Sequence, residues 1–357
     1  MDKKRVVVAM SGGVDSSLAA ALLKEAGDEV IGVTMQIWPR QAPKWNRFGG
    51  CCGLEAIESA KQVAHKLGIS HYVMNLRDIF AQKVIADFCR EYSLGRTPNP
   101  CIRCNQYIKF EALLQRVKEL DANFMATGHY ARIDHSPNGY CLLKAVDLSK
   151  DQSYFLYILG QKELQHLLFP LGNLHKVEVR KLAAKLGLST ASRRASQDVC
   201  FIPDNDYRSF IATHVPLKSG DIIDTEGKIL GKHSGLARYT VGQRQGLGLA
   251  SNKRLYVLRL DTANNRLVVG TKDQLLSNRL LASKLSWVSG KAPEEPSNIT
   301  AKIRYKSPEI AVKLHTNNGM AEVQFHQPQP AITPGQAVVF YQGDVVLGGG
   351  IIKDRAD

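Results

Sequence analysis

The chain has 357 residues, of which 44% are hydrophobic and 22% charged, a composition typical of globular proteins. No apolar stretch reaches the roughly 20 residues of a membrane-spanning helix, and residues 1–5 lead too quickly into an apolar run for a leader peptide. The net charge of +14, from 47 basic and 33 acidic residues, favours a polyanionic partner such as nucleic acid, the alternative being a basic surface without a partner. We expect a cytoplasmic protein of two or three domains.

The first third of the chain alternates short apolar runs with longer amphipathic segments. We predict strands at residues 5–10, 29–35, 71–76 and 124–127, and helices at 18–26, 54–67, 79–94 and 108–120. A long polar loop is expected over 36–53, and Pro98 and Pro100 predict a nonhelical segment over 95–105. This repeated order predicts an α/β protein with a parallel sheet covered on both faces.

The pattern changes after residue 130. Residues 131–134 and 140–145 flank Ser136-Pro137-Asn138-Gly139 and predict a hairpin, while 161–168 and 176–186 have helical periodicity. From about residue 220 the chain becomes rich in turns. Five alternating runs, at 299–305, 310–314, 320–325, 337–341 and 345–351, predict a small barrel or sandwich.

The stretch Ser11-Gly12-Gly13-Val14-Asp15-Ser16-Ser17 joins the first predicted strand to the first predicted helix. Such a loop directs backbone N–H groups at an anion, and the helix adds the positive end of its dipole. Gly12 and Gly13 leave room for a phosphate, whereas Asp15 suits a Mg²⁺ ion or the helix cap. The loop lacks the Gly-Lys-Ser/Thr of the Walker pattern and resembles the S-G-G-x-D-S loop of the PP-loop ATP pyrophosphatases. An ordinary serine-capped turn is the alternative interpretation.

A second candidate is Thr127-Gly128-His129-Tyr130, which closes the predicted strand 124–127. Ligands of parallel sheets bind beyond the carboxyl ends of the strands, where the glycine loop also lies. We therefore expect Gly128 to approach a nucleotide and His129 to face the reacting group, a structural histidine being the alternative.

The chain has seven cysteines, and Cys101-x-x-Cys104 lies in the proline-rich segment. In a cytosolic chain, two thiols at this spacing can share a metal, form a disulfide, or pair a nucleophile with a partner. Cys200 is available as a distant third, and no second pair completes a zinc site. Cys89 and Cys141 are expected to be packed. The roles of Cys51 and Cys52 stay open.

Several further motifs occur in the order found in one enzyme family. They are Arg96-Thr97-Pro98-Asn99-Pro100, Cys104-Asn105, Lys150-Asp151-Gln152-Ser153-Tyr154, Cys200-Phe201-Ile202, Gly242-Gln243-Arg244 and Thr333-Pro334-Gly335-Gln336. Together with the glycine loop they resemble the bacterial tRNA-specific 2-thiouridylases (MnmA/TrmU), over essentially the whole chain. The resemblance implies a PP-loop (adenine nucleotide α-hydrolase-like) catalytic domain over 1–204, a small central β domain over 205–275, and a tRNA-contacting C-terminal β-barrel over 276–357.

The resemblance also implies a reaction. ATP activates the C2 oxygen of the wobble uridine as an adenylate, a persulfide sulfur replaces that oxygen, and AMP and pyrophosphate are released. ATP and Mg²⁺ are the implied cofactors, and tRNA (those for Lys, Glu and Gln) is the implied substrate. A cysteine desulfurase or a sulfur-relay protein is the implied sulfur donor.

Residues that match the family's motifs take their expected roles from it. The nucleotide is expected on Ala9, Met10, Ser11, Gly12, Gly13, Val14, Asp15, Ser16, Met35 and Gly128. Contacts with tRNA are expected from Asn99, Pro100, Cys101, His129, Lys150, Asp151, Gln152, Arg304, Tyr305 and Gln336. The implied catalytic set is Asp15, Cys104 as nucleophile and Cys200 as persulfide carrier.

Cys101 departs from the family pattern, because many relatives carry Asp at this position. A third thiol beside Cys104 and Cys200 leaves two mechanisms open. In the first, Cys200 carries a persulfide that Cys104 helps to release. In the second, the three cysteines bind an iron–sulfur cluster whose unique iron holds the sulfur.

Three other functions remain as alternatives. An adenylating ligase for a small molecule would need neither the cysteines nor the basic charge. A synthase of 4-thiouridine would carry an additional RNA-binding domain before its phosphate loop. A non-enzymatic RNA-binding protein would need no intact loop at residues 11–17.

Overall fold

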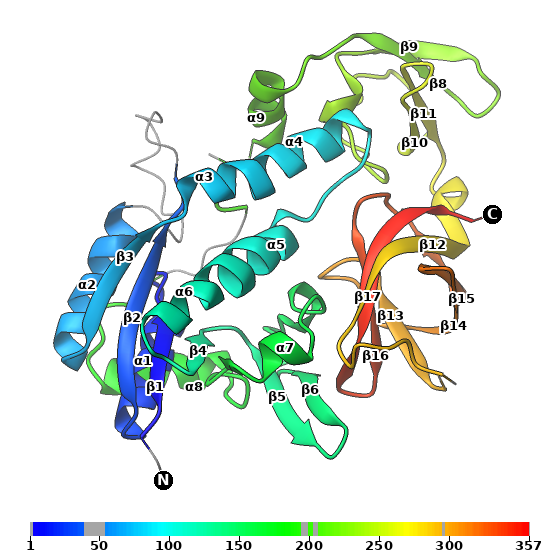
Figure 1. The fold of residues 1–357 in the computed structure, drawn as a ribbon. Helices are drawn as coiled ribbons and strands as arrows, with labels where there is room; N and C mark the ends of the chain where they lie inside the picture. The colour runs from blue at the N-terminus through cyan, green and yellow to red at the C-terminus, as the bar shows by residue number, and fades with distance from the viewer. Residues whose placement is uncertain (1–2, 39–53, 194–198, 203–205, 295–296, 357) are drawn as a thin grey trace.

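The computed structural model describes residues 3–38, 54–193, 199–202, 206–294 and 297–356. Figure 1 shows three parts in chain order: a parallel sheet flanked by helices, a small β-rich part, and a barrel that holds the C-terminus. The long loop expected over 36–53, with Cys51 and Cys52, lies almost entirely outside the described residues. Within the described ranges, no helix is long and apolar enough to cross a membrane.

The first part is built on a five-stranded parallel sheet of order β3-β2-β1-β4-β7. Its strands are β1 (Arg5–Ala9), β2 (Glu29–Gln36), β3 (Ser70–Asn75), β4 (Phe124–Thr127) and β7 (Leu167–Leu168). The four strands predicted in this part are confirmed. The helix expected over 161–168 is only α7 (Gln161–Leu164), because Leu167 and Leu168 pair with Met125 and Ala126 of β4 and extend the sheet instead.

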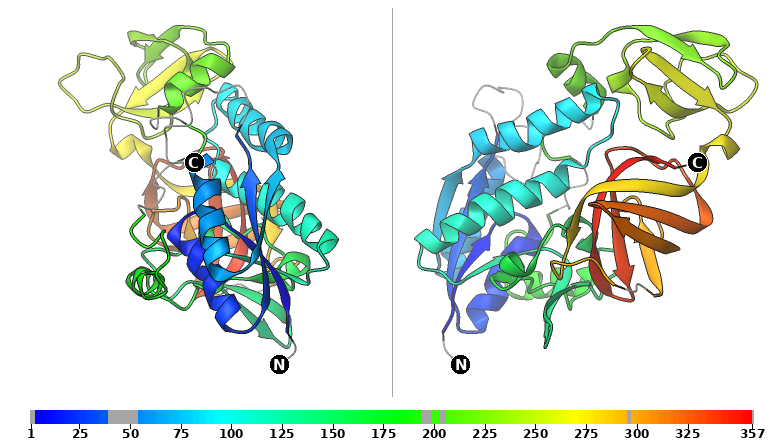
Figure 2. Two further views of the ribbon diagram at one scale, coloured as in Figure 1. Left: turned by 90° about the vertical axis from the view of Figure 1, so that its left-hand side faces the viewer. Right: turned by 45° about the vertical axis from the view of Figure 1, so that its right-hand side comes forward.

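Alternation along β1 divides the core between the two faces of the sheet. Val6 and Val8 belong to one apolar cluster, and Val7 and Ala9 belong to the other. The first face is covered by α1 (Val14–Glu25), α2 (Leu54–Leu67) and α8 (Lys176–Lys185). The second is covered by two helical runs: α3 (Arg77–Phe80), η2 (Ala81–Ile85) and α4 (Ala86–Ser93), then α5 (Pro100–Arg103), η3 (Cys104–Leu113) and α6 (Leu114–Glu119). Figures 1 and 2 show these two runs side by side between the sheet and the barrel.

Two helices begin earlier than predicted. α1 starts at Val14, because Gly13 is extended and is already its N-cap. α5 starts at Pro100, so the nonhelical prediction is wrong from this residue on. Proline is tolerated at the first helical position, where its missing N–H has no intrahelical partner. The Asn99 side chain caps this helix by accepting bonds from the backbone N–H groups of Cys101 and Ile102.

The second part begins with α9 (Tyr207–His214) and contains a four-stranded sheet of order β10-β11-β8-β9. Its elements are β8 (Gly220–Ile223), β9 (Ile229–His233), η6 (Leu236–Arg238), β10 (Tyr256–Asp261) and β11 (Arg266–Gly270). Ile222, Val257, Leu267 and Val269 are fully buried between its strands and loops. This arrangement confirms the small β-rich part expected before the barrel.

The third part is a closed barrel of order β12-β15-β14-β13-β16-β17, because β12 pairs with both β15 and β17. Its strands are β12 (Leu276–Trp287), β13 (Ile299–Lys302), β14 (Ile310–Asn317), β15 (Met320–Pro330), β16 (Ala337–Gln342) and β17 (Val345–Arg355). The five predicted strands are confirmed, and β12, whose bulges interrupt its alternation, was not predicted. The borders expected at 204/205 and 275/276 stay a prediction.

A hairpin from the first part joins the barrel. β5 (Ala131–Ser136) and β6 (Gly139–Lys144) form the predicted hairpin, and Leu143 pairs with Val345 of β17. The parallel-sheet part and the barrel therefore share one eight-stranded sheet.

Residues 95–99, which we call the junction segment, connect α4 to α5 and contact the barrel. The Thr97 N–H donates to the Pro334 carbonyl at 2.8 Å. The Gln336 amide donates to the carbonyls of Thr97 at 3.0 Å and Pro98 at 3.2 Å. The barrel thus holds the backbone that enters α5 directly.

The junction segment also contacts the second part. The Thr97 hydroxyl donates to the Thr240 hydroxyl at 3.3 Å. Gly95 has a φ of +69°, and a Cβ there would come within 2.7 Å of Thr262 Cγ2. Five residues therefore tie all three parts of the molecule together.

Gln336→Ala removes both amide bonds to the junction segment. Each is worth about 1 kcal/mol, so we expect hydrogen exchange of the 97–104 backbone to accelerate roughly thirtyfold. Gln342→Ala is the matched control, because its amide donates to Ser297, outside the junction segment. Equal exchange at 97–104 in both variants would show that Gln336 does not fix this segment.

Candidate active site

The glycine loop lies at the carboxyl end of β1, where the order of the parallel sheet reverses. After β1 the chain builds β2 and β3 on one side, and it then places β4 on the other side of β1. Ala9 is paired with both Val33 of β2 and Thr127 of β4. Crevices at such points are where open parallel sheets bind ligands.

The loop is preorganised by its own hydroxyl groups. The Ser16 hydroxyl accepts from the Ser11 N–H at 3.0 Å, and the Ser17 hydroxyl donates to the Gly13 carbonyl at 2.8 Å. Gly12 has a φ of +68° and packs on the Ala56 backbone of α2, so a side chain there has no room. Gly13 caps α1 without a side-chain hydrogen bond, which leaves the first N–H groups of the helix suited to an anion.

Asp15 does not cap α1, so that part of the prediction is wrong. It lies in the first turn, after the N-cap Gly13. Its two carboxylate oxygens accept from Lys176 Nζ at 2.5 and 2.7 Å, and one also accepts from the Tyr130 hydroxyl at 2.8 Å. The Lys176 ammonium lies 5.5 Å from the Tyr130 ring centre. Both carboxylate oxygens therefore have hydrogen-bond donors: Lys176 donates to both, and Tyr130 donates to one.

Lys176 and Arg193 are basic residues that the sequence analysis missed. The Lys176 N–H donates to Asp147 at 2.9 Å, which fixes the start of α8 and lowers the pKa of Asp147. Arg193 donates to the Gly12 carbonyl at 2.9 Å and to the Ser59 hydroxyl at 2.7 Å. They lie 161 and 181 residues from the loop residues that they contact, and only a folded chain brings these cations to the loop.

Gly128 packs against the first turn of α1. A Cβ there would lie 2.7 Å from the Ser16 nitrogen and 2.8 Å from the Asp15 carbonyl carbon. The predicted nucleotide residues thus gather at the ends of neighbouring strands, with Ala9 and Met10 ending β1, Met35 near the end of β2, and Gly128 after β4. Their contact with a nucleotide stays a prediction.

His129 is buried, with 8% of its surface exposed. Its Nδ1 bonds to the Thr127 hydroxyl at 2.7 Å, and its Nε2 lies 3.2 Å from Lys109 Nζ. Phe110 and Phe169 pack around the ring. Burial first, and then the Lys109 charge, hold the pKa of His129 well below its usual value, so the ring is neutral at physiological pH.

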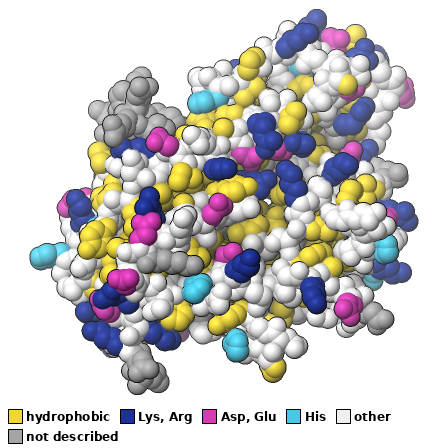
Figure 3. Space-filling model, viewed as in Figure 1, with side chains coloured by type: hydrophobic (Ala, Val, Ile, Leu, Met, Phe, Trp, Pro, Cys, Tyr) yellow, Lys and Arg dark blue, Asp and Glu magenta, His cyan; other side chains and the backbone are white. Residues whose placement is uncertain are grey.

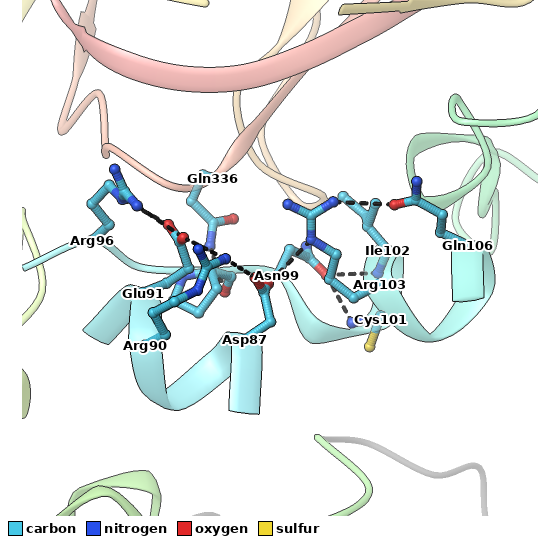
Figure 4. Close-up of polar contacts among 11 residues, drawn as sticks. Asp87, Arg90, Glu91, Arg96, Asn99, Cys101, Ile102, Arg103, Gln106 and Gln336 are labelled. Carbon is cyan, nitrogen blue, oxygen red and sulfur yellow. Dashed lines mark hydrogen bonds and ion pairs between the residues drawn. The ribbon is translucent and has the colours of Figure 1, made fainter. Parts of the chain in front are cut away.

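Cys101 and Cys104 lie one turn apart at the start of the helical run from α5, not in a loop. Cys101 is exposed and Cys104 is half-buried. Arg103, between them, donates to Asp87 at 3.2 Å and to Gln106 at 3.1 Å. Figure 4 shows the Cys101 sulfur on the side of α5 away from the barrel ribbon.

The helix that precedes the junction segment is braced by an ion pair whose carboxylate is buried. Arg96 binds Glu91 through two bonds of 2.6 and 2.9 Å, and only 5% of Glu91 is exposed. Arg90 pairs with Asp87, as Figure 4 also shows. Because Asp87 binds Arg103 as well, this network fixes the cysteine-bearing helix against α4.

Cys200 is half-buried and is positioned by its neighbour. Phe201 packs edge-on against Phe80, Phe88 and Phe210, with ring centres 5.7, 5.3 and 5.4 Å away. Cys200 and Cys104 both pack against the apolar cluster that includes Met35. Across the described residues, no group of three or more His, Cys, Asp or Glu side chains is arranged to hold a metal ion.

The predicted tRNA residues fall into two sets. The first set has structural partners within the protein, and the second, with Lys150, is exposed to solvent. In the first set, Asp151 accepts from the backbone N–H groups of Ala145 and Ser153, and Gln152 accepts from the Tyr130 N–H. Pro100 is buried at the first position of α5.

Of the two predicted tRNA residues at positions 304 and 305, Tyr305 lies against the first part. Arg304 donates to the Pro330 carbonyl at 2.8 Å, and burial lowers its pKa. The Tyr305 ring lies 4.4 Å from Phe155, and burial first, then Asp151 and Cys101, raise the pKa of Tyr305. The structure therefore packs Tyr305 against Tyr154 and Phe155 of the first part. Figure 3 shows Lys and Arg side chains spread over this view, with a group near its centre.

The fold and the site define an α/β protein with the glycine loop of the PP-loop class, a cysteine-bearing helix and two β-rich parts. Three family models match in sequence: "tRNA methyl transferase HUP domain" at residues 4–204, "tRNA methyl transferase PRC-barrel domain" at 208–271, and "Aminomethyltransferase beta-barrel domain" at 277–352.

Similar proteins carry a more specific name. The chain is 53% identical to the tRNA-specific 2-thiouridylase MnmA of Heliobacterium modesticaldum, covering 99% of this chain and 94% of the relative. It is 50% identical to that of Halothermothrix orenii, covering 98% and 99%. The chain belongs to the family of the tRNA-specific 2-thiouridylases.

Among solved structures, a 4-thiouridine synthetase in complex with RNA and ATP is 16% identical, covers 59% of this chain and 50% of that one, and has a TM-score of 0.34. This likeness is too weak to bear on function.

Lys176→Met should leave the Asp15 carboxylate uncompensated beside the phosphate site. We expect the KM for ATP to rise roughly tenfold or more, because an unpaired carboxylate repels phosphate. Lys181→Met, on the exposed side of the same helix, is the matched control. An unchanged KM for ATP in Lys176→Met would show that Lys176 has no role in the phosphate site.

His129 predicts a pH dependence of stability. The pKa of His129 is lowered in the folded chain. Below about pH 6.5 the unfolded chain therefore binds this proton more readily, and the stability of the folded protein decreases as the pH falls. His129→Gln should therefore shrink the loss of Tm between about pH 7.5 and about pH 5.5. His135→Gln, at an exposed position of β5, should keep the full loss. An equal loss in both variants would contradict the account.

Proposed function

We propose that this chain replaces the C2 oxygen of the wobble uridine of tRNA with sulfur, in two steps that consume ATP. The observation that carries the proposal is the combination of two features around one parallel sheet. One is the phosphate loop with Lys176 and Arg193, and the other is a pair of half-buried thiols, Cys104 and Cys200, on one apolar cluster. Family membership supports the same activity.

In the first step, the uridine C2 oxygen attacks the α-phosphorus of ATP. The bond from this phosphorus to the bridging oxygen breaks, and pyrophosphate leaves with the electron pair. The N–H groups at the start of α1 are suited to the phosphates. Lys176 and Arg193 oppose the charge of the departing pyrophosphate.

The Mg²⁺ expected with ATP has no protein site that we assign. Asp15 is the carboxylate of the loop, and both of its oxygens already accept from Lys176. A single paired carboxylate does not make a magnesium site. No step is therefore routed through the ion.

In the second step, a persulfide on Cys200 supplies the sulfur. Its terminal sulfur attacks C2, and AMP leaves with the former C2 oxygen. The Cys104 thiolate then attacks the Cys200 sulfur, which forms a disulfide and frees the thiocarbonyl. A thiol reductant restores both cysteines. Cys89 is unsuited to this chemistry, because burial raises the pKa of its thiol to about 11.

The iron–sulfur mechanism is the second candidate, because Cys101 adds a third thiol. The described side chains include no group of three arranged for a metal, and Cys101 is exposed. The residues as arranged do not fit a cluster, so we derive no step through one. Iron and sulfide bound in stoichiometric amounts after anaerobic purification would overturn this choice.

The proposed partners rest on the family resemblance. We propose tRNA as substrate, with the isoacceptors for Lys, Glu and Gln as the set, and a cysteine desulfurase or a sulfur-relay protein as donor. ATP, tRNA and reduced thiols occur together in the cytoplasm, where we place the protein.

The test is to incubate the protein with ATP, a cysteine desulfurase, cysteine and unmodified tRNA, and to analyse the digested RNA by mass spectrometry. We expect 2-thiouridine at the wobble position. A methylated base would instead support the methyltransferase activity named by the family models. A 4-thiouridine product would support a synthase of 4-thiouridine. No modified base at all would refute the proposed function.

Cys200→Ser should abolish 2-thiouridine formation and leave the Kd for tRNA within about twofold, because the thiol is a sulfur carrier. Cys104→Ala should also stop turnover. Cys141→Ser, in the β5–β6 hairpin, is the matched control and should keep full activity. Normal turnover in Cys200→Ser would exclude it as the carrier.

A further inference from the structure

The motif Gly242-Gln243-Arg244 lies in the second part, away from the phosphate loop and the cysteines. It belongs to a turn over residues 242–246, which we call the arginine turn. Two glycines with positive φ, Gly242 at +86° and Gly246 at +73°, enclose it. Neither of the two proposed chemical steps uses this turn.

Close packing on both glycines fixes the arginine turn. A Cβ at Gly242 would lie 2.6 Å from the Ala331 Cβ of the barrel, and one at Gly246 would lie 2.7 Å from Arg208 Nη1 of α9. The Gln243 amide bridges the turn, accepting from the Thr240 N–H at 3.2 Å and donating to the Gln245 carbonyl at 2.9 Å. The Gln243 amide therefore holds the turn, and Arg244 is exposed on it.

The arginine turn forms one wall of a surface pocket. The pocket is lined by Tyr207, Arg208, Gln243, Arg244, Gln245 and Tyr256. Arginines, tyrosines and amides are the side chains that contact phosphates and riboses in RNA complexes. No carboxylate belongs to this lining.

The segment that carries the arginine turn is basic, whereas Asp206, next to Tyr207 of the lining, caps α9. Residues 238–256 contain Arg238, Arg244, Lys253 and Arg254 and no Asp or Glu. Arg244 is exposed, and within the described ranges it makes no ion pair. A displayed guanidinium without a carboxylate partner is suited to a phosphate oxygen.

The pocket is connected to the cysteine-bearing helix. Tyr207 stacks on Tyr92 of α4, with ring centres 5.5 Å apart. Thr240, which begins the approach to the arginine turn, accepts from Thr97 of the junction segment. A polyanion bound in this pocket is therefore next to Tyr207 and Thr240, which contact α4 and the junction segment that leads into α5.

We propose that this pocket binds the ribose–phosphate backbone of the substrate tRNA, at nucleotides away from the reacting uridine. The inference rests on the proposed function for the identity of the RNA. Arg244 binds a phosphate and Arg208 braces the turn beneath it. Tyr207 and Tyr256 form the floor on which a ribose or an unpaired base packs.

The test compares Arg244→Glu with Lys232→Glu, which makes the same charge change at an exposed position of β9 in the same part. The Kd for an unmodified tRNA transcript is measured by filter binding over a range of salt concentrations. We expect Arg244→Glu to weaken binding roughly tenfold at moderate salt and to reduce the salt slope by about 1, because one phosphate contact is lost. Lys232→Glu should stay near wild type.

Arg244→Gln keeps the proposal testable if the reversed charge disturbs the turn, and it should lie between wild type and Arg244→Glu. Equal Kd values and salt slopes for Arg244→Glu and Lys232→Glu would overturn the proposal that this pocket binds tRNA, even if the wild type makes 2-thiouridine. Normal tRNA binding with slower sulfur delivery would indicate a protein partner and would also overturn it. Absence of product from the wild type would instead count against the proposed function, independently of the binding data.

Discussion

The site depends on one constraint of the parallel sheet: β1 and β4 are neighbours, and the chain leaves them in different directions. β1 ends in the glycine loop and α1, while β4 ends in Gly128. Gly128 then packs within van der Waals contact of the first turn of α1, which is possible only without a side chain. The helix start, the loop and the end of β4 therefore form one surface. Lys176 and Arg193 reach it from α8 and the segment beyond, and they give it a positive charge.

The second half of the proposed chemistry depends on how the three parts are joined. The junction segment receives hydrogen bonds from the barrel and donates one to the second part, and its last residue, Asn99, caps α5. Several residues expected to contact tRNA thus also have structural roles, among them Gln336 and Asp151. The proposed RNA sites on the barrel and on the arginine turn are linked by hydrogen bonds to the junction segment, which leads into the helix that carries Cys101 and Cys104. In our proposal, this link is the route by which substrate binding affects the position of the thiols.

Features that depend on local sequence were predictable. The loop at residues 11–17 has its strand, glycines and helix in immediate succession, and the β5–β6 hairpin carries its own turn residues. Pro100 was misread, because proline breaks a helix interior but is accepted at its first position. β7 is two residues long and exists only because β4 offers an open edge. Lys176 and Arg193 carry no local signal, since their role comes from contacts across more than 160 residues. The same is true of the contacts that join Tyr305 to Tyr154 and Phe155.

The central claim is that the chain activates the C2 oxygen of uridine before sulfur replaces it. A tRNA whose target uridine carries a heavy-oxygen label at C2 tests this claim most directly. After one turnover with ATP and a sulfur donor, the label should be found in the phosphate of AMP, and the modified RNA should have lost it. A label found in water or in pyrophosphate, or retained in the thiolated RNA, would contradict the account.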